Sequence, residues 1–237
     1  MPTATVQCRW RVRRSRHVSE GAELRQAGIT APIQLFGGFF PEQIDAIHKN
    51  QLEFTLCDSA NLAPLQAFAQ RQKTTVPVHV KFDTGMHRVG MPWQRAEAVF
   101  IELRKSTGVQ VIGLMTHFAS SDASDKTFAR EQLARFHTVI EKVKQAGLRI
   151  PFVHAANSGA IIDMPEAHFN LVRAGIAMYG YYPSPETSES VSLQPALSWR
   201  SRLLQVKKIQ ADDAVSYGGI WKAERETCIG TVAIGYA

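Results

Sequence analysis

Hydrophobic and polar residues follow two different periods over most of the chain. Alternation with a period of two predicts a strand at residues 76–82, and helical spacing predicts a long amphipathic helix at residues 129–146. Further strands are expected at residues 33–36, 53–57, 109–118, 152–156 and 171–179, and further helices at residues 19–28, 41–48, 60–72, 93–105 and 159–162. This alternation of strands and helices indicates parallel βαβ units.

Six predicted strands are two short of an eight-stranded barrel, and the missing pair would precede residue 18. We therefore expect an α/β fold, a (β/α)8 TIM-type barrel that is incomplete at its N-terminus. After residue 185 the pattern changes to Val-, Leu- and Ile-rich runs without helices, which predicts a partial antiparallel β domain. The expected division is an atypical leader at residues 1–17, a barrel domain at 18–190 and a truncated β domain at 191–237.

Apolar run lengths and cysteine spacing indicate the cellular compartment of the protein. No apolar run is long enough to span a bilayer, and no signal-peptide pattern opens the chain. Cys8, Cys57 and Cys228 are odd in number and widely spaced, without a CxxC pair, which favours a reducing compartment over disulfides or a zinc site. We expect a cytoplasmic protein that does not associate with membranes.

The formal net charge of +6 raises the question of a nucleic-acid partner. Most of this excess is confined to a short N-terminal segment, which holds Arg9, Arg11, Arg13, Arg14 and Arg16. Without these five arginines the body of the protein is close to neutral and has no basic stripe. We therefore expect no nucleic-acid partner, although a basic-armed nucleic-acid-binding module stays open as an alternative.

Reactive side chains gather where the predicted strands end, which is where parallel barrels place their active sites. These candidates are Lys81, Asp83, Arg88, Thr116, His117, His154, Asn157, Ser158, Arg173, Gly175 and Ile176. Arg173 lies inside an apolar segment, and a buried guanidinium needs partners. Asn157 and Ser158 open a predicted helix, an arrangement that suits a phosphate group.

Two kinds of site are compatible with these residues. Asp83, His117 and His154 could hold a divalent metal ion for hydrolysis. However, no two histidines have a ligand spacing such as HxH, and Arg88 and Arg173 would repel a cation. The arginines favour an anionic cofactor, with its phosphate at the last two strands and no metal ion.

The segment KFDTGMHRVG at residues 81–90 resembles the K-x-D-T-G-M-x-R-x-G motif of alanine racemases, which use pyridoxal 5'-phosphate (PLP). Segments at residues 115–119, 154–158, 172–180, 215–218 and 234–237 match further motifs in the family's order. The resemblance covers residue 18 to the end. It implies a PLP-dependent amino-acid racemase, an isomerase that interconverts L- and D-alanine and supplies D-alanine for peptidoglycan, and a homodimer with shared active sites.

The resemblance also implies roles for individual residues. Lys81 corresponds to a lysine that is often carbamylated and then orients Arg88, which contacts the PLP phenolic oxygen and the region of the substrate carboxylate. Arg173 would donate a hydrogen bond to the pyridine nitrogen. Because a guanidinium stays protonated, it cannot give the ring a proton, so the ring is a weaker electron sink and transamination is limited.

The remaining roles concern the phosphate and the base. Ser158, Gly175 and Ile176 would bind the phosphate beside Asn157. Tyr217 would act as the general base on one face of the α-carbon in the partner subunit's site. A phenol titrates near pH 10, and the pair of His117 and Arg173 is placed to lower the pKa of that phenol.

The sequence also departs from the family pattern. The second base of the family is the Schiff-base lysine of a K-A-x-A-Y-G-H-G motif on the first barrel strand, and this motif does not occur here. Residues 8–16 stand at the corresponding end and resemble no strand of the family. We therefore expect a fragment that is inactive or nearly so as it stands, and a non-catalytic PLP-binding barrel protein remains an alternative.

Overall fold

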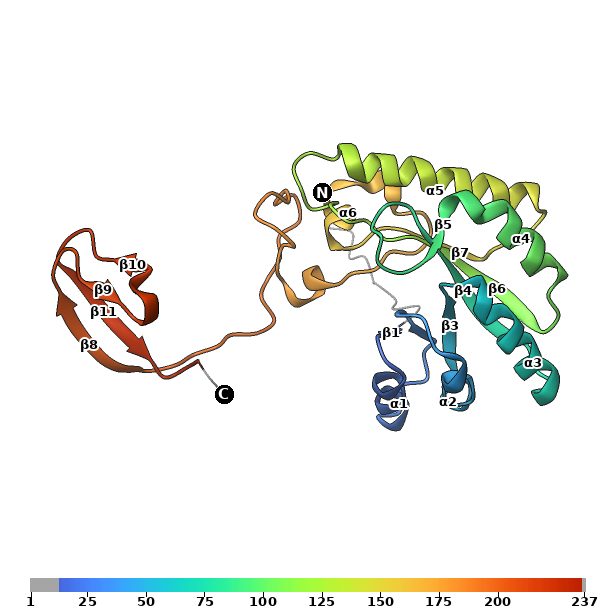
Figure 1. Cartoon of the computed structure of the whole chain (residues 1–237), viewed down its shortest axis with the longest axis horizontal. Helices are drawn as coiled ribbons and strands as arrows, with labels where there is room; N and C mark the ends of the chain where they lie inside the picture. The colour runs from blue at the N-terminus through green and yellow to red at the C-terminus, as the bar shows by residue number, and fades with distance from the viewer. Residues whose placement is uncertain (1–12, 236–237) are drawn as a thin grey trace, which may run out of the picture. The chain divides into compact units, whose positions relative to one another are not determined.

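The computed structural model describes residues 13–235. Cys8, Arg9 and Arg11 of the predicted leader, and Tyr236 of the last family-like motif, lie outside this range. The chain separates into two compact units, of which the first ends at Gln194 and the second begins at Pro195 (Figure 1). Each unit is described by itself below, and the predicted domain boundaries stay predictions.

The first unit is built on a parallel sheet with the strand order β1-β2-β3-β4-β6-β7. Its strands are β1 (Arg13–Ser15), β2 (Ile33–Leu35), β3 (Leu52–Leu56), β4 (Val76–Asp83), β6 (Val109–Met115) and β7 (Phe152–His154), with the short β5 (Met91–Pro92) paired to β4. Over residues 13–235 no strand joins β7 back to β1. The predicted incomplete barrel is confirmed as a parallel half-barrel.

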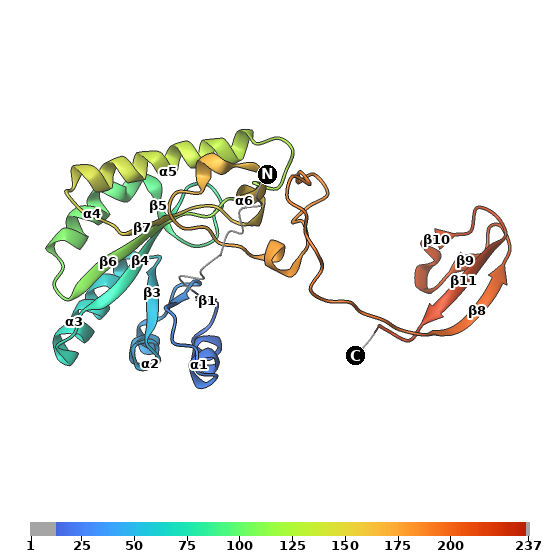
Figure 2. The same cartoon turned by 180° about the vertical axis from the view of Figure 1, so that it is seen from behind.

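Helices surround the outer side of this curved sheet (Figures 1 and 2). They are α1 (Val18–Gln26), α2 (Ile44–Lys49), α3 (Leu62–Gln72), α4 (Ala96–Lys105), α5 (Thr127–Gln145) and α6 (Ser158–Asp163). On α5, Phe136, Val139 and Val143 are buried, which is the spacing of one helix face. The helix stops before Gly147, whose φ of +66° favours glycine.

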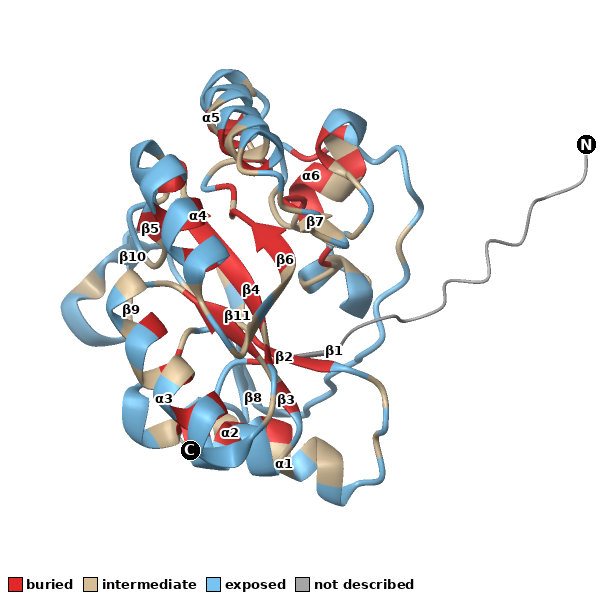
Figure 3. Ribbon diagram, turned by 90° about the vertical axis from the view of Figure 1, so that its right-hand side faces the viewer, coloured by how far each residue is buried: buried red, intermediate tan, exposed pale blue. Residues whose placement is uncertain are grey.

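The two faces of the sheet differ in chemistry, and the inner strand β4 is an example. Val78, Val80 and Phe82 are fully buried on the face toward the helices, and the Phe82 ring lies 5.4 Å from that of Phe100 on α4. Because side chains alternate along a strand, His79 and Lys81 lie on the other face. Buried residues accordingly concentrate on the strands and on the inner sides of the helices (Figure 3).

Two details of the first unit correct the sequence predictions. The predicted strand at residues 171–179 is wrong, because this segment is an extended loop followed by a 3-10 helix at Ile176–Tyr179. The amides of Gly175 and Ala177 donate to the Ser158 hydroxyl instead of to a neighbouring strand. The sheet also begins earlier than residue 18, since β1 pairs in parallel with β2.

The second unit is antiparallel, as predicted. Strand β8 (Leu203–Ile209) pairs with β11 (Thr227–Val232), and β9 (Ala214–Val215) pairs with β10 (Trp221–Lys222). Its strands are largely exposed. Among all the residues that the structure describes, no helix is both long and apolar enough to cross a membrane.

Candidate functional site

The centre of the site is the guanidinium of Arg173, which is only 3% exposed. Its Nη1 lies 2.9 Å from His154 Nδ1, and its Nη2 lies 3.1 Å from His117 Nδ1. Nη2 also donates to the carbonyl oxygens of Thr116 and Ala155, at 2.8 and 2.6 Å. These contacts fix the guanidinium at the carboxyl ends of β6 and β7.

A second cation, Lys81, lies close to Arg173 on the same face of the sheet. Lys81 is 3% exposed, and its Nζ lies 4.8 Å from the centroid of the Phe36 ring. The guanidinium carbon of Arg173 lies 5.6 Å from the same ring, and the His117 ring meets it edge-on at 5.7 Å. Phe36 thus contacts both cations through its aromatic face, an attractive cation–π arrangement.

The environment of Lys81 lowers its pKa. Burial lowers the pKa of Lys81, and the charges of Arg173 and Arg88 lower the pKa further, while Cys57 and Asp83 act in the opposite direction. Burial is the main cause, because an ammonium loses its hydration when it is enclosed. Lys81 is therefore more easily deprotonated than an exposed lysine, and a neutral amine is a nucleophile.

Asn157 holds the turn between β7 and α6. Its side-chain oxygen accepts a hydrogen bond from the Ala160 amide at 3.2 Å, which caps the helix, and also accepts one from the Ser121 hydroxyl. Its side-chain nitrogen donates to the Phe118 carbonyl at 3.4 Å. The predicted helix opening is confirmed, and Asn157 itself is engaged in shaping it.

Ser158 joins this turn to the segment that follows Arg173. Its hydroxyl accepts hydrogen bonds from the amides of Gly175 at 2.9 Å and Ala177 at 3.2 Å. A Cβ added at Gly175 would lie 3.4 Å from the same hydroxyl, so glycine leaves this side of Ser158 open. Ile176 begins the 3-10 helix here and is exposed.

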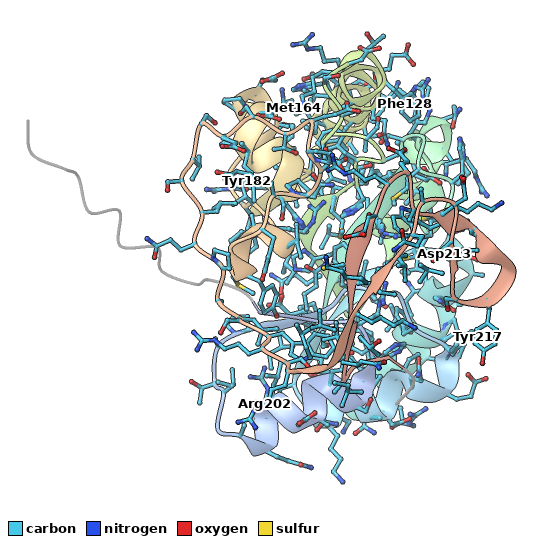
Figure 4. All side chains as sticks on the ribbon, turned by 90° about the vertical axis from the view of Figure 1, so that its left-hand side faces the viewer. Phe128, Met164, Tyr182, Arg202, Asp213 and Tyr217 are labelled. Atoms are coloured by element: carbon cyan, nitrogen blue, oxygen red, sulfur yellow. The ribbon has the colours of Figure 1, made fainter. Side chains whose placement is uncertain are left out.

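Two predicted residues lie apart from this cluster. Arg88 is exposed on the loop between β4 and β5, although it is close enough to affect the pKa of Lys81. Tyr217 belongs to the second unit, where it begins the 3-10 helix Tyr217–Gly219 and is 91% exposed (Figure 4). The predicted roles of both residues stay predictions.

Sequence reasoning missed three residues that contact the cluster, namely Phe36, His79 and Glu53. His79 and Glu53 lie at polar positions of alternating strands, on the same side as Lys81 and Cys57 respectively. Side chains two or four residues before a strand end lie on the same face as the residue at that end. Following this alternation back from Lys81 and from Cys57 could have found His79 and Glu53. Nothing in the pattern marks Phe36, because it follows β2 as one aromatic residue among several.

The charges around the cluster suit an anion. Lys81, Arg88 and Arg173 are the cations identified above, and Ser158 adds a hydroxyl. Within residues 13–235, no group of three or more His, Cys, Asp or Glu side chains could hold a metal ion. The arrangement can donate hydrogen bonds to an anionic molecule and hold it in one orientation.

Comparison with known proteins gives a consistent result. Family models described as "Alanine racemase, N-terminal domain" and "Alanine racemase, C-terminal domain" match residues 15–183 and 196–237. An alanine racemase from Clostridium perfringens is 40% identical over 222 residues, which cover 93% of this chain and 58% of that protein. This chain therefore spans less than two thirds of the length of that curated relative.

Solved structures give the same picture. The alanine racemase of Clostridium difficile 630 matches with a TM-score of 0.79 and 32% identity, over 95% of this chain and 59% of that one. The alanine racemase of Bartonella henselae with covalently bound pyridoxal phosphate has a TM-score of 0.75 over 95% of this chain and 61% of its own. At 23% identity, this second likeness shows the fold alone.

Proposed function

Because the chain belongs to the alanine racemase family, we propose that it carries the barrel part of a PLP-dependent site that interconverts L- and D-alanine. The observation that carries this proposal is the buried guanidinium of Arg173, held by two imidazoles and two carbonyl oxygens next to Lys81. Such an isomerase would supply D-alanine for the cell wall. The cytoplasmic location and a homodimer with shared sites stay predictions of the family resemblance.

The residues present fit PLP. Ser158, Gly175 and Ile176 would hold its phosphate, in the space that Gly175 leaves beside the Ser158 hydroxyl, and Asn157 shapes that turn. Arg173 would donate to the ring nitrogen, and Arg88 would contact the phenolic oxygen. When bound, PLP withdraws electrons from an attached amino acid, so that its α-proton can be removed.

Arg173 would orient the ring without changing its proton count. A guanidinium has donors only and stays protonated, so it can hold the ring nitrogen but cannot transfer a proton to it. His117 accepts a hydrogen bond from Arg173 through Nδ1, which leaves its Nε2 as the ring atom that carries the proton. We propose that this N–H of His117 faces the Tyr217 phenol of a second subunit and favours its ionised form.

Lys81 would act on Arg88. Burial favours the neutral amine of Lys81, which can attack carbon dioxide, form an N–C bond and release a proton. The carbamate formed in this way is an anion. It would hold Arg88 toward the phenolic oxygen and the substrate carboxylate, while a protonated lysine there would repel it.

The 237 residues contain no K-A-x-A-Y-G-H-G segment, so we propose that this chain alone does not invert alanine. Inversion needs a base on each face of the α-carbon, and Tyr217 supplies only one. Purified chain, PLP and L-alanine in D2O should therefore give no D-alanine above the level of free PLP. Formation of D-alanine would show that another residue replaces the family's lysine.

PLP binding tests the site itself. Titration of the chain with PLP, followed by absorbance, should show saturable binding, and Ser158→Ala should weaken the affinity on the order of tenfold through loss of a phosphate contact. Ser106→Ala is a matched control, because its hydroxyl bonds only the Glu102 carbonyl at the end of α4 among the contacts described. Saturable binding without α-proton exchange would favour the non-catalytic PLP-binding barrel, and absence of binding would contradict the proposal.

A further inference from the structure

Four side chains of the first unit form one continuous line of hydrogen bonds. Arg173 Nη1 lies 2.9 Å from His154 Nδ1, and His154 Nε2 lies 3.0 Å from His79 Nδ1. His79 Nε2 in turn lies 3.1 Å from Glu53 Oε2. The line runs from the arginine at the strand ends to a carboxylate near the start of β3, through one imidazole on β7 and one on β4.

The protons in this line can be arranged in only one way. Arginine only donates, so His154 Nδ1 must accept and His154 Nε2 must carry the proton. His154 Nε2 then donates to His79 Nδ1, and His79 Nε2 donates to the carboxylate of Glu53. Protonation of either imidazole on its second nitrogen would place two N–H groups face to face. Both imidazoles are therefore neutral Nε2–H tautomers.

Strand β6 leaves space for this line at Gly113. Gly113 is the register partner of His79, and a Cβ added there would lie 1.9 Å from His79 Nδ1. The backbone of Gly113 is not in the left-handed region, so no turn requires glycine at this position. Its lack of a side chain serves the His79 ring, which is fully buried against it. The line is thus accommodated by a strand that contributes no group to it.

The line also connects a buried cation to an anion. The hydrogen-bond acceptors of Arg173 described above are two carbonyl oxygens and two imidazole nitrogens, all neutral. Glu53 adds a carboxylate, whose side chain is 17% exposed, two imidazoles away. Hydrogen bonds in series polarise one another where the effective dielectric constant is low. The negative charge of Glu53 can in this way strengthen the bond from Arg173 to His154.

We propose that Glu53, His79 and His154 are positioning residues that fix the orientation of the Arg173 guanidinium through this directed line. The arginine is then held in one position, and both imidazoles keep a single tautomer. That Arg173 faces the ring of PLP rests on the proposed function. The tautomers of the two histidines and the direction of the line do not depend on the proposed function.

Imidazole nitrogen shifts test the line without any ligand. In the full chain labelled with ¹⁵N, long-range ¹H–¹⁵N correlation spectra should show His79 and His154 as pure neutral Nε2–H tautomers. Glu53→Leu removes the final acceptor but leaves His79 Nδ1 facing the His154 Nε2–H, so the tautomers should stay and the His79 Nε2–H proton resonance should move upfield as its hydrogen bond is lost. Glu53→Gln keeps an acceptor oxygen and should retain the tautomers. A mixed or Nδ1–H form of either histidine in the wild-type chain would overturn the proposal.

PLP affinity then tests the positioning of Arg173. Glu53→Leu should weaken PLP binding on the order of tenfold and Glu53→Gln by less, because the second variant loses only the charge. Glu97→Gln is the control, since Glu97 pairs with Lys142 on the surface, and it should change neither the tautomers nor the affinity. Loss of the His79 Nε2–H hydrogen bond with unchanged affinity in Glu53→Leu would overturn the positioning role. If the wild-type chain bound no PLP, the proposed function would fail, and the tautomers alone would decide whether the line exists.

Discussion

The strands of the two units contain similar hydrophobic residues but differ in burial. Val78, Val80 and Phe82 of β4 are fully buried, because helices cover that face of the half-barrel. Leu204 and Val206 of β8 are 71% and 59% exposed in a two-stranded pair. The hydrophobic pattern predicts a strand in both units, whereas burial requires a second layer of structure. Packing energy is therefore concentrated in the first unit.

Charged residues show the same difference. Lys81 and Arg173 are buried beside each other in the first unit, where burial lowers the pKa of Lys81. Lys208 and Glu226 of the second unit form an exposed ion pair at 2.9 Å. An exposed pair of this kind contributes little to stability, because water screens both charges. Perturbed side-chain chemistry is thus found where the strands are covered.

The largest difference is expected for removal of a core ring. Phe100→Ala leaves a cavity beside Phe82 and should lower the free energy of unfolding by about 3–5 kcal/mol in urea titrations. Ile220→Ala in the second unit removes a side chain that is 95% exposed and should change the free energy by less than about 0.5 kcal/mol. Similar effects of the two substitutions would contradict the contrast in packing.

Thiol reactivity gives the next largest difference. Burial raises the pKa of Cys57 to about 11, so at pH 8 its thiolate population is about a hundredfold below that of an exposed, ordinary thiol. Cys228 is exposed. Iodoacetamide at pH 8, with peptides followed by mass spectrometry, should therefore modify Cys228 about a hundredfold faster than Cys57. Equal rates would show that Cys57 is accessible and unperturbed.

Two strand glycines offer a matched comparison, for which the expected difference in the free energy of unfolding is somewhat smaller. Gly113→Ala would drive a methyl group into the buried His79 ring, and we expect a loss of about 1–3 kcal/mol in the free energy of unfolding. Gly230→Ala in β11 meets only the end of the Leu203 side chain, at 2.9 Å, which can rotate away. Its cost should be below about 0.5 kcal/mol. Urea titration of both variants would show whether the interior of the first unit is as inflexible as its packing indicates.

Removal of a buried charge is expected to stabilise the first unit. Lys81→Met keeps the length of the side chain and removes an ammonium that burial disfavours, so the free energy of unfolding should rise by about 1 kcal/mol at pH 7. Lys208→Met removes only the exposed pair with Glu226 and should have almost no effect. A loss of stability in Lys81→Met would mean that Lys81 is held by compensating contacts.

The pH dependence of this gain has a definite sign. The folded chain releases the Lys81 proton below the usual pKa of 10.5, whereas the unfolded chain releases it near that value. The unfolded state therefore binds more protons between the two values, and wild-type stability rises with pH across this window. The advantage of Lys81→Met should be full below the lowered pKa, decline across this window and be lost above about pH 10.5. Cys57 has the opposite effect between about pH 9 and 11, but both chains contain it.

Most of the fold could be predicted from the sequence because each inner strand has a clear period and a short length. The strands at β2, β3, β4, β6 and β7 all form where alternation or an apolar run predicts them. The family resemblance predicts the pairing of His117 with Arg173, and the structure places them 3.1 Å apart. Residues that follow different strands can be predicted to lie close together because parallel strands bring their carboxyl ends to one edge of the sheet.

The rest could not be predicted because it depends on contacts between distant residues. Residues 171–179 have apolar content typical of a strand, but their amides bond Ser158 and not a neighbouring strand. The contact of Phe36 with both Lys81 and Arg173 depends on where the ends of β2 and β4 and the loop at residues 171–175 lie in space. No local pattern contains that information.

The polar face of β4 also has a consequence for how the chain folds. Register partners are fixed here, with His79 opposite Thr55 of β3 and Gly113 of β6. A slip of one residue would turn His79 and Lys81 toward the helices, where charged and polar groups would meet aromatic rings, and would turn Val80 into the polar interior. The residues of the candidate site therefore also select one alignment of the sheet and discourage misfolded pairings.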